Sequence, residues 1–145
     1  MKEAILKRMK EKGLKLTSQR LAIVDAFVHQ NRLHPSARLI YQEARKKYRG
    51  LSFSTVYLTL NGLSKHGIIK MLEFDRMENR YDGNIGEHIN LVCKGCRKIL
   101  DYQVPRVLNT KDVVQKARFW VTETRLEYYG YCAGCKEKLS VRSRE

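Results

Sequence analysis

Four cysteines carry the clearest chemical signature in this sequence. They form two C-x-x-C pairs, Cys93/Cys96 and Cys132/Cys135, which 35 residues separate, and no cysteine is left over. Two such pairs favour a closed tetrathiolate zinc site in a reducing compartment. Disulfides or redox-active thiols stay open as alternatives. Four thiolates leave zinc no open position for water, and neither pair lies in the βαβ context of a redox C-x-x-C. We therefore expect no enzymatic activity and no small-molecule substrate.

Further donor side chains surround the first cysteine pair. The stretch HINLVCKGCRKILDY, residues 88–102, adds His88, Asn90 and Asp101 to the two cysteines. On their own, these residues leave open whether the stretch binds one metal ion, binds two, or is only a loop closed by a disulfide.

The charge of the chain is concentrated in its first half. The 145 residues carry a formal net charge of +14; residues 1–70 hold 15 Lys/Arg against 4 Asp/Glu, and residues 71–145 hold 14 against 11. This asymmetry predicts a polyanion-binding half, with a merely soluble basic surface as the alternative. No run of about 18 apolar residues is present, and the N-terminus is too charged for a signal peptide. We expect a cytoplasmic protein that does not bind membranes.

Helical periodicity and capping residues predict four helices and a hairpin in the first half. The helices are expected over 3–12, from Thr17 or Ser18 to about His29, from Pro35 to before Gly50, and from Ser52 or Ser54 to before Gly67; the hairpin is expected over 68–83. On a basic half, this order predicts a winged helix-turn-helix domain over residues 1–83. A small helical bundle with an added hairpin is the alternative.

The second half, residues 84–145, has a different pattern of predicted secondary structure. The pattern predicts strands over 88–92 and 98–102, a helix from Pro105 to about Ala117, and a β-rich run over 119–129. A unit of this size builds only a small core, and structural zinc contributes on the order of 10 kcal/mol to folding such a domain. Because edge strands of a small sheet usually pair, we expect a homodimer through this sheet. The fold class is therefore α+β, with a winged-helix domain followed by a small α/β dimerisation domain.

Several motifs in order resemble the ferric uptake regulator family of bacterial metal-dependent repressors. They are GLKLTSQRLAI (13–23), HPSARLIY (34–41), LSFSTVYLTLNGL (51–63) and the two C-x-x-C pairs with YGYCAGC, and together they cover essentially the whole chain. The resemblance implies a DNA-binding winged helix, a dimerisation domain with structural zinc, and a regulatory metal site formed by both.

The resemblance assigns DNA contacts to three residues. Lys15 matches a basic residue that enters an A·T-rich minor groove, Arg20 matches a phosphate-binding arginine, and Tyr57 matches a tyrosine that contacts thymine methyl groups. Both kinds of groove contact are physically sound. On the same recognition helix, Ser54, Thr55 and Asn61 are further candidates. Leu58 stands where the family usually has arginine, so one phosphate contact is expected to be lost.

The resemblance also implies a regulatory site separate from the cysteines. Its ligands are His34 from the DNA-binding half, Asp82 from the end of the hairpin, and His88 and Asp101 from the second half, with Asn90 where the family usually has histidine. Nitrogen and oxygen donors of this kind suit Fe(II) or Mn(II). An amide oxygen is a weaker donor than imidazole, so Asn90 should lower metal affinity.

The predicted function is a dimeric repressor of iron-homeostasis or peroxide-stress genes that binds a palindromic A·T-rich DNA operator when metal is bound. Asp82 and Asp101, together with the two histidines, resemble the peroxide-sensing branch of the family. The alternative is a constitutive DNA-binding module whose regulatory site is degraded and which holds only structural zinc.

Overall fold

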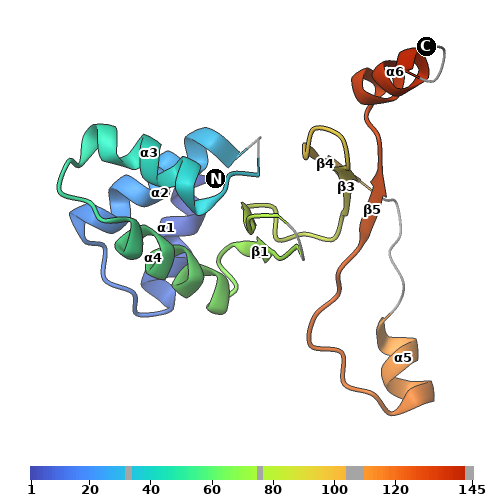
Figure 1. Cartoon of the computed structure of the whole chain (residues 1–145). Helices are drawn as coiled ribbons and strands as arrows, with labels where there is room; N and C mark the ends of the chain where they lie inside the picture. The colour runs from blue at the N-terminus through green and yellow to red at the C-terminus, as the bar shows by residue number, and fades with distance from the viewer. Residues whose placement is uncertain (32–33, 75–76, 104–109, 143–145) are drawn as a thin grey trace. The chain divides into compact units, whose positions relative to one another are not determined.

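The computed structural model describes residues 1–31, 34–74, 77–103 and 110–142 (Figure 1). The chain divides into two compact units, Met1–Ile85 and Gly86–Glu145, called here the N-terminal and C-terminal units. Helices together with two small sheets make up these units, which confirms the α+β class. In the part of the chain that the structure describes, no helix is both long and apolar enough to cross a membrane.

The N-terminal unit contains four helices, and their ends follow the sequence signals. They are α1 (Lys2–Glu11), α2 (Ser18–Gln30), α3 (Ala37–Lys47) and α4 (Phe53–Lys65). The hydroxyls of Thr17, Ser36 and Ser52 cap the last three by accepting hydrogen bonds from backbone N–H groups in the first turn. Gly67 adopts φ +66° directly after α4, a conformation that favours glycine. The helix expected to begin at Pro35 begins two residues later because Ser36 is its cap.

A short antiparallel hairpin follows α4. Strand β1 (Lys70–Leu72) pairs with β2 (Arg80–Asp82), with Met71 opposite Tyr81. The helices and this hairpin share one core of buried residues, among them Ile5, Met9, Ile23, Val24, Phe27, Ile40, Val56, Leu60, Leu63, Ile68, Ile69 and Tyr81. The predicted order of helices and wing is therefore present, and Tyr81 anchors the wing in the core of the unit.

The C-terminal unit is built on a three-stranded sheet. Its central strand β3 (Ile89–Cys93) pairs antiparallel with β4 (Ile99–Tyr102) and parallel with β5 (Glu127–Gly130). Helix α5 (Thr110–Ala117) precedes β5 and α6 (Ala133–Arg142) follows it. The buried apolar side chains among the described residues of this unit are few: Ile89, Val92, Cys93 and Ile99.

The C-terminal unit differs from the prediction in two elements. The β-rich run predicted over 119–129 is a strand only from Glu127, because pairing with β3 begins at Asn90 opposite Glu127. Helix α6 was not predicted. The start predicted for the helix at Pro105 lies outside the described residues, and the part that the structure describes, Thr110–Ala117, is helical.

Candidate metal centres and nucleic-acid interface

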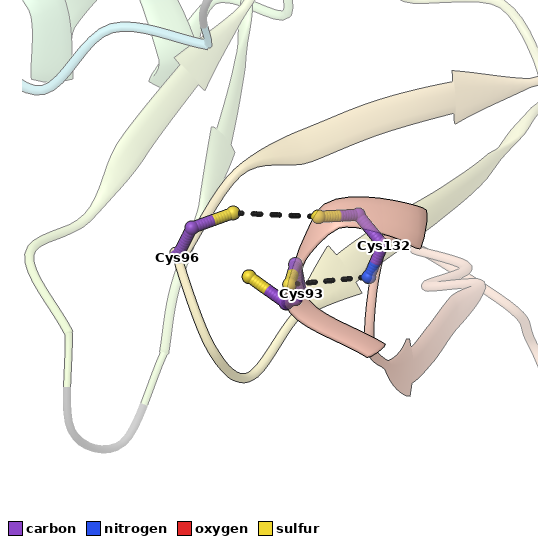
Figure 2. A group of neighbouring side chains, drawn as sticks. Cys93, Cys96 and Cys132 are labelled. Carbon is purple, nitrogen blue, oxygen red and sulfur yellow. Dashed lines mark hydrogen bonds between the residues drawn. The ribbon is translucent and has the colours of Figure 1, made fainter. Parts of the chain in front are cut away.

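The fold brings the four predicted cysteines together. The first pair lies at the turn between β3 and β4, and the second lies where β5 passes into α6, so the parallel pairing of β3 with β5 joins the two pairs. All four Sγ atoms lie within 4.8 Å of one another, and Cys96 Sγ is 3.8 Å from Cys132 Sγ (Figure 2). Four sulfurs about 2.3 Å from a tetrahedral zinc ion are separated by about 3.8 Å. The cluster therefore fits zinc.

Hydrogen bonds inside the cluster already favour thiolate at one position. The backbone N–H of Cys132 donates to Cys93 Sγ at 3.3 Å (Figure 2). Hydrogen bonds from the backbone of Cys96 and then Cys132 lower the pKa of Cys93 to about 6. The hydrogen bond of the Cys135 thiol with Cys132 is the main cause, and burial the next, that raises the pKa of Cys135 to about 12. Four thiolates at this spacing therefore require a bound cation.

A glycine makes the close approach of the two pairs possible. A Cβ atom placed on Gly95 would lie 2.8 Å from Cys135 Sγ and 3.0 Å from Cys135 Cβ. Gly134 occupies the same third position in the second C-x-x-C pair, yet a Cβ atom there would meet nothing within 4 Å. The sequence presents both glycines alike, and only the fold distinguishes them.

Two oxygen and nitrogen donors lie in the N-terminal unit. A ring nitrogen of His34 and a carboxylate oxygen of Asp82 lie within 4.8 Å of each other, and both side chains are buried. Strand β2 holds the segment of His34 in place, because the backbone N–H of Tyr81 donates to the carbonyl of Pro35 at 3.0 Å. His34 itself has φ 45°, a left-handed conformation that is uncommon outside glycine.

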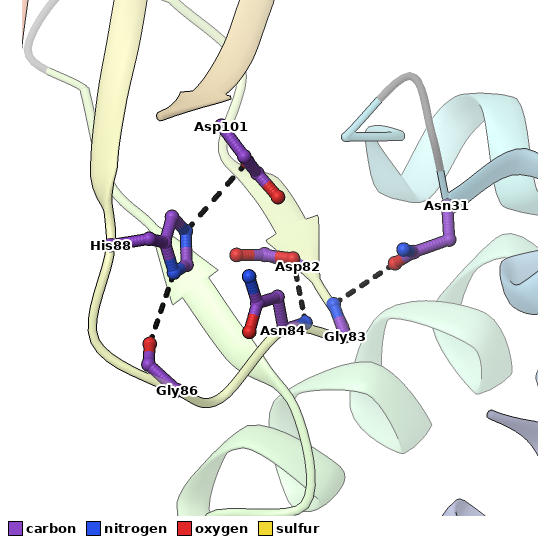
Figure 3. Close-up of polar contacts among 7 residues, drawn as sticks. All are labelled: Asn31, Asp82, Gly83, Asn84, Gly86, His88 and Asp101. Carbon is purple, nitrogen blue, oxygen red and sulfur yellow. Dashed lines mark hydrogen bonds and ion pairs between the residues drawn. The ribbon is translucent and has the colours of Figure 1, made fainter. Parts of the chain in front are cut away.

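Further donors lie on one face of the C-terminal sheet (Figure 3). The ring of His88 donates from Nδ1 to the carbonyl of Gly86 at 3.0 Å, since a carbonyl can only accept. The other ring nitrogen, Nε2, lies 3.7 Å from Asp101 Oδ1. An imidazole nitrogen and a carboxylate oxygen this close together can bind one cation between them. The pair therefore fits a metal ion that binds nitrogen and oxygen.

Asn90 lies on the same face of the sheet. It pairs with Asp101 across the antiparallel ladder, and partners in such a ladder present their side chains to one face. Its Oδ1 is buried and accepts no hydrogen bond from the residues that the structure describes. A buried amide oxygen of this kind is available to a cation. In the N-terminal unit, Asp82 Oδ1 also accepts a hydrogen bond from the backbone of Asn84 at 2.8 Å (Figure 3).

Aromatic rings from α3 and α4 contact one another in a row. Phe53 meets Tyr41 edge-on, with ring centroids 5.8 Å apart, and meets Tyr57 at 6.4 Å. The guanidinium of Arg45 lies 5.7 Å from the centre of the Tyr41 ring. Tyr57 is thus supported by its neighbour while its own side chain stays exposed. Sequence reasoning missed Phe53, whose position at the first residue of α4 gives no signal of this role.

The other DNA-contact candidates differ in what their side chains already bind. Lys15 and Ser54 are exposed. Arg20 donates to the carbonyl of Lys15 at 2.9 Å and so fixes the segment that carries this lysine. The hydroxyl of Thr55 contacts that of Ser52 at 2.8 Å as part of the helix cap.

Asn61 is engaged inside the N-terminal unit. Its Oδ1 accepts a hydrogen bond from the hydroxyl of Tyr81 at 2.9 Å, which joins α4 to β2. Burial raises the pKa of Tyr81 to about 12. The side-chain oxygen of Asn61 therefore holds the wing against α4, a role that the helical pattern does not reveal.

Comparisons with known proteins identify relatives along most of the chain. The sequence model of the Ferric uptake regulator family matches residues 11–129. The Peroxide-responsive repressor PerR of Staphylococcus epidermidis is 32% identical over 137 residues, which are 94% of this chain and 91% of that protein.

Two solved structures resemble the chain as a whole. The Helicobacter pylori ferric uptake regulator Fur, a protein with three functional metal binding sites, matches with a TM-score of 0.74 at 30% identity over 94% of each chain. PerR from Streptococcus pyogenes, whose structure concerns peroxide sensing and gene regulation, matches with a TM-score of 0.51 at 30% identity over 92% of each chain.

Proposed function

Because this chain belongs to the Ferric uptake regulator family, whose members are metal-responsive transcriptional regulators, we propose that it is a metal-dependent repressor of iron-homeostasis or peroxide-stress genes. It binds a palindromic A·T-rich operator as a homodimer. Residues 1–83 bind the DNA, and residues 84–145 form the contacts between the two copies.

The observation that carries this proposal is the separation of two kinds of donor. The cysteine cluster supplies sulfur and suits structural zinc. His88 and Asp101 instead present a nitrogen and an oxygen that face each other at 3.7 Å, and His34 with Asp82 form a second buried pair. Such donors suit Fe(II) or Mn(II). A chain with structural zinc alone has no need of them.

The donors also come from both units, His34 and Asp82 from the N-terminal unit and His88 and Asp101 from the C-terminal unit. A metal ion that binds donors from both units favours the arrangement of the units in which those donors converge. Metal shifts the populations of the arrangements only because it binds one of them more tightly than the others. We propose that this arrangement is the one that matches both half-sites of the operator.

Exposed apolar surface on the C-terminal unit supports the homodimer. Trp120 is 81% exposed and Tyr128 is 64% exposed. An open groove of about 220 Å³ runs beside the sheet, lined by residues that include Leu91, Leu100 and Tyr129. Large exposed apolar patches of this kind mark interaction sites, and a second copy of the same surface would cover this one.

The test measures operator binding with and without Mn(II). The His88→Ala variant should lose the tightening that Mn(II) gives to the wild type, because it removes Nε2. The matched control is His29→Ala, which changes an exposed histidine on α2 and should keep full metal dependence. Unchanged metal dependence in His88→Ala would refute the regulatory site. Metal-independent binding by the wild type itself would support the constitutive module, which the metal-responsive relatives do not favour.

We further propose the peroxide-sensing branch, because relatives at 31–32% identity over 94% of the chain are peroxide-responsive repressors. The test is mass analysis of the Fe(II)-loaded protein after peroxide is added. Oxygen added to the peptides that carry His34 or His88 is the expected result. An unchanged mass would instead favour iron or manganese sensing.

Asn90 should weaken this site without abolishing it. Its buried Oδ1 can donate electrons to a cation, but less strongly than imidazole. Asn90→His should therefore tighten Mn(II) binding, measured by equilibrium titration of zinc-loaded protein. Weaker Mn(II) binding by this variant would contradict the role given to Asn90.

A further inference from the structure

Leu58 is an apolar side chain that the fold directs into solvent. It is 69% exposed, the highest value among the large apolar side chains of the described residues in the N-terminal unit. Its neighbours two positions away along α4, Val56 and Leu60, are fully buried. Because residues two apart on a helix lie on nearly opposite sides, Leu58 points directly away from the core. No packing role in the N-terminal unit accounts for leucine here.

The face that Leu58 occupies is the outward face of the recognition helix. Tyr57 precedes it, Ser54 lies one turn before it, and Lys65 lies two turns after it on the same side. All three are exposed. The ring of Tyr57 packs against that of Phe53, so the exposed apolar pair Tyr57 and Leu58 rests on a neighbouring aromatic side chain.

Hydrogen-bonding groups are scarce on this face. The hydroxyl of Thr55 belongs to the cap at Ser52, and Oδ1 of Asn61 accepts from Tyr81. The other polar groups near Leu58 are the hydroxyls of Ser54, Tyr57 and Thr59, the side-chain NH2 of Asn61, and Lys65 two turns along the helix. A surface with this composition selects its partner largely by apolar contact.

Charge favours a polyanion as the partner, and the proposed function makes that polyanion double-stranded DNA. Residues 1–70 carry 15 Lys/Arg against 4 Asp/Glu, so a polyanion is attracted to this unit. The major groove of DNA offers one apolar group at the base edges, the C5-methyl of thymine. Leucine cannot hydrogen-bond, so it would bury the polar edge of guanine, adenine or cytosine without compensation.

We propose that Leu58 is a specificity-determining residue that packs on a thymine C5-methyl group in the major groove of each operator half-site. The proposal rests on the proposed function as a DNA-binding regulator. The family usually has arginine at this position, which makes a polar contact, whereas leucine here contacts the methyl group. The operator of this protein should therefore carry a thymine that arginine would not select.

The experiment removes the methyl group from the DNA and the side chain from the protein. The wild-type protein with Mn(II) first selects duplexes from a randomised pool. Each thymine of the selected duplex is then replaced in turn by deoxyuridine, which pairs identically but lacks the methyl group. Loss of one buried methyl should weaken wild-type binding about fourfold, and loss in both half-sites about 15-fold. Leu58→Ala should bind the thymine and deoxyuridine duplexes equally at that position.

Two further variants sharpen the result. Leu58→Met keeps an apolar contact of similar volume and should keep sensitivity to the methyl group. Leu58→Arg should lose this sensitivity and add about two units to the slope of log affinity against log salt, because each copy in the dimer gains one phosphate contact. Since Leu58 is exposed, all three variants should unfold at the wild-type temperature.

Two outcomes would overturn the proposal while leaving DNA binding intact. In one, deoxyuridine weakens Leu58→Ala as much as the wild type at every position, so that another residue reads the methyl groups. In the other, Leu58→Ala weakens binding to all duplexes equally. If the wild type selects no duplex at all, the proposed function fails instead, before Leu58 is tested.

Discussion

Replacement of Gly95 by alanine should weaken zinc binding, and the structure gives the size of the effect. The added Cβ would lie 2.8 Å from Cys135 Sγ and 3.0 Å from Cys135 Cβ, whereas ordinary contact begins at 3.4 Å. Ordinary contact at both atoms therefore requires Cys135 to move away by about 0.6 Å at its sulfur and about 0.4 Å at its Cβ. A zinc site tolerates about 0.2 Å in its ligand distances. The sulfur cannot swing aside freely, because the metal fixes it.

The free-energy cost follows from overpacking. Inserting a methyl group into a closely packed site costs about 1–3 kcal/mol. Because 1.4 kcal/mol corresponds to tenfold in affinity, zinc should bind about 5- to 150-fold more weakly. Among the described residues, positive φ values of glycine occur at Gly13 and Gly67, so the backbone of Gly95 accepts alanine and the clash alone is tested.

The assay is competition for zinc with a chromophoric chelator under anaerobic, reducing conditions. Gly134→Ala is the matched control, since it changes the same position of the other C-x-x-C pair where nothing lies within 4 Å. It should bind zinc as the wild type does, and alanine should favour α6 by about 1 kcal/mol. Equal zinc affinities for the two variants would show that the close approach at Gly95 does not constrain the cluster.

Three other predictions concern stability. Tyr81→Phe removes the buried hydrogen bond to Asn61 and should lower the free energy of unfolding of the N-terminal unit by about 1 kcal/mol in urea denaturation; an unchanged midpoint would contradict this. The hydrogen bond from Arg38 holds the pKa of Glu78 below its usual 4.5. The ionised carboxylate therefore stabilises the folded protein at pH values above the unfolded-state pKa, and this stabilisation is lost as the pH falls through the lowered folded-state pKa. Glu78→Gln should therefore lower the melting temperature slightly at neutral pH and not in acid, and a difference that persists in acid would refute the ion pair. Chelation of zinc under reducing conditions should abolish hydrogen-exchange protection in β3 and β5 but not in α2–α4, since the C-terminal unit buries few apolar side chains; protection retained in both units would argue against a structural zinc.

Much of the N-terminal unit could be predicted because its signals are local. Thr17, Ser52 and Gly67 act within one turn of the chain, so capping and glycine conformation mark where helices begin and end. The cysteine cluster was also predictable, because two C-x-x-C pairs have few other uses in a reducing compartment. The four cysteines therefore lie together as predicted, while the roles of His34, Asp82, His88, Asn90 and Asp101 stay a prediction.

What could not be predicted depends on contacts between distant segments. Asn61 has a helical position suited to DNA, but Tyr81, twenty residues later, engages its oxygen. The run 119–129 has β propensity throughout, but only the part that pairs with β3 becomes a strand. Helix α6 was not predicted because it begins inside the second cysteine pair, between Cys132 and Cys135, and these residues were interpreted only as metal ligands.

The parallel pairing of β3 with β5 bears on synthesis of the protein. Asn90 pairs with Glu127 and Cys93 pairs with Gly130. Strand β3 is therefore synthesised more than thirty residues before β5, the strand with which it pairs. A ribosome therefore releases the complete apolar core of the N-terminal unit well before the metal cluster can close. A chain that ends before Glu127 would fold its helices and wing yet lack both β5 and the second thiol pair. Quality control of such fragments would have to recognise the unfinished sheet, because their N-terminal units would be native.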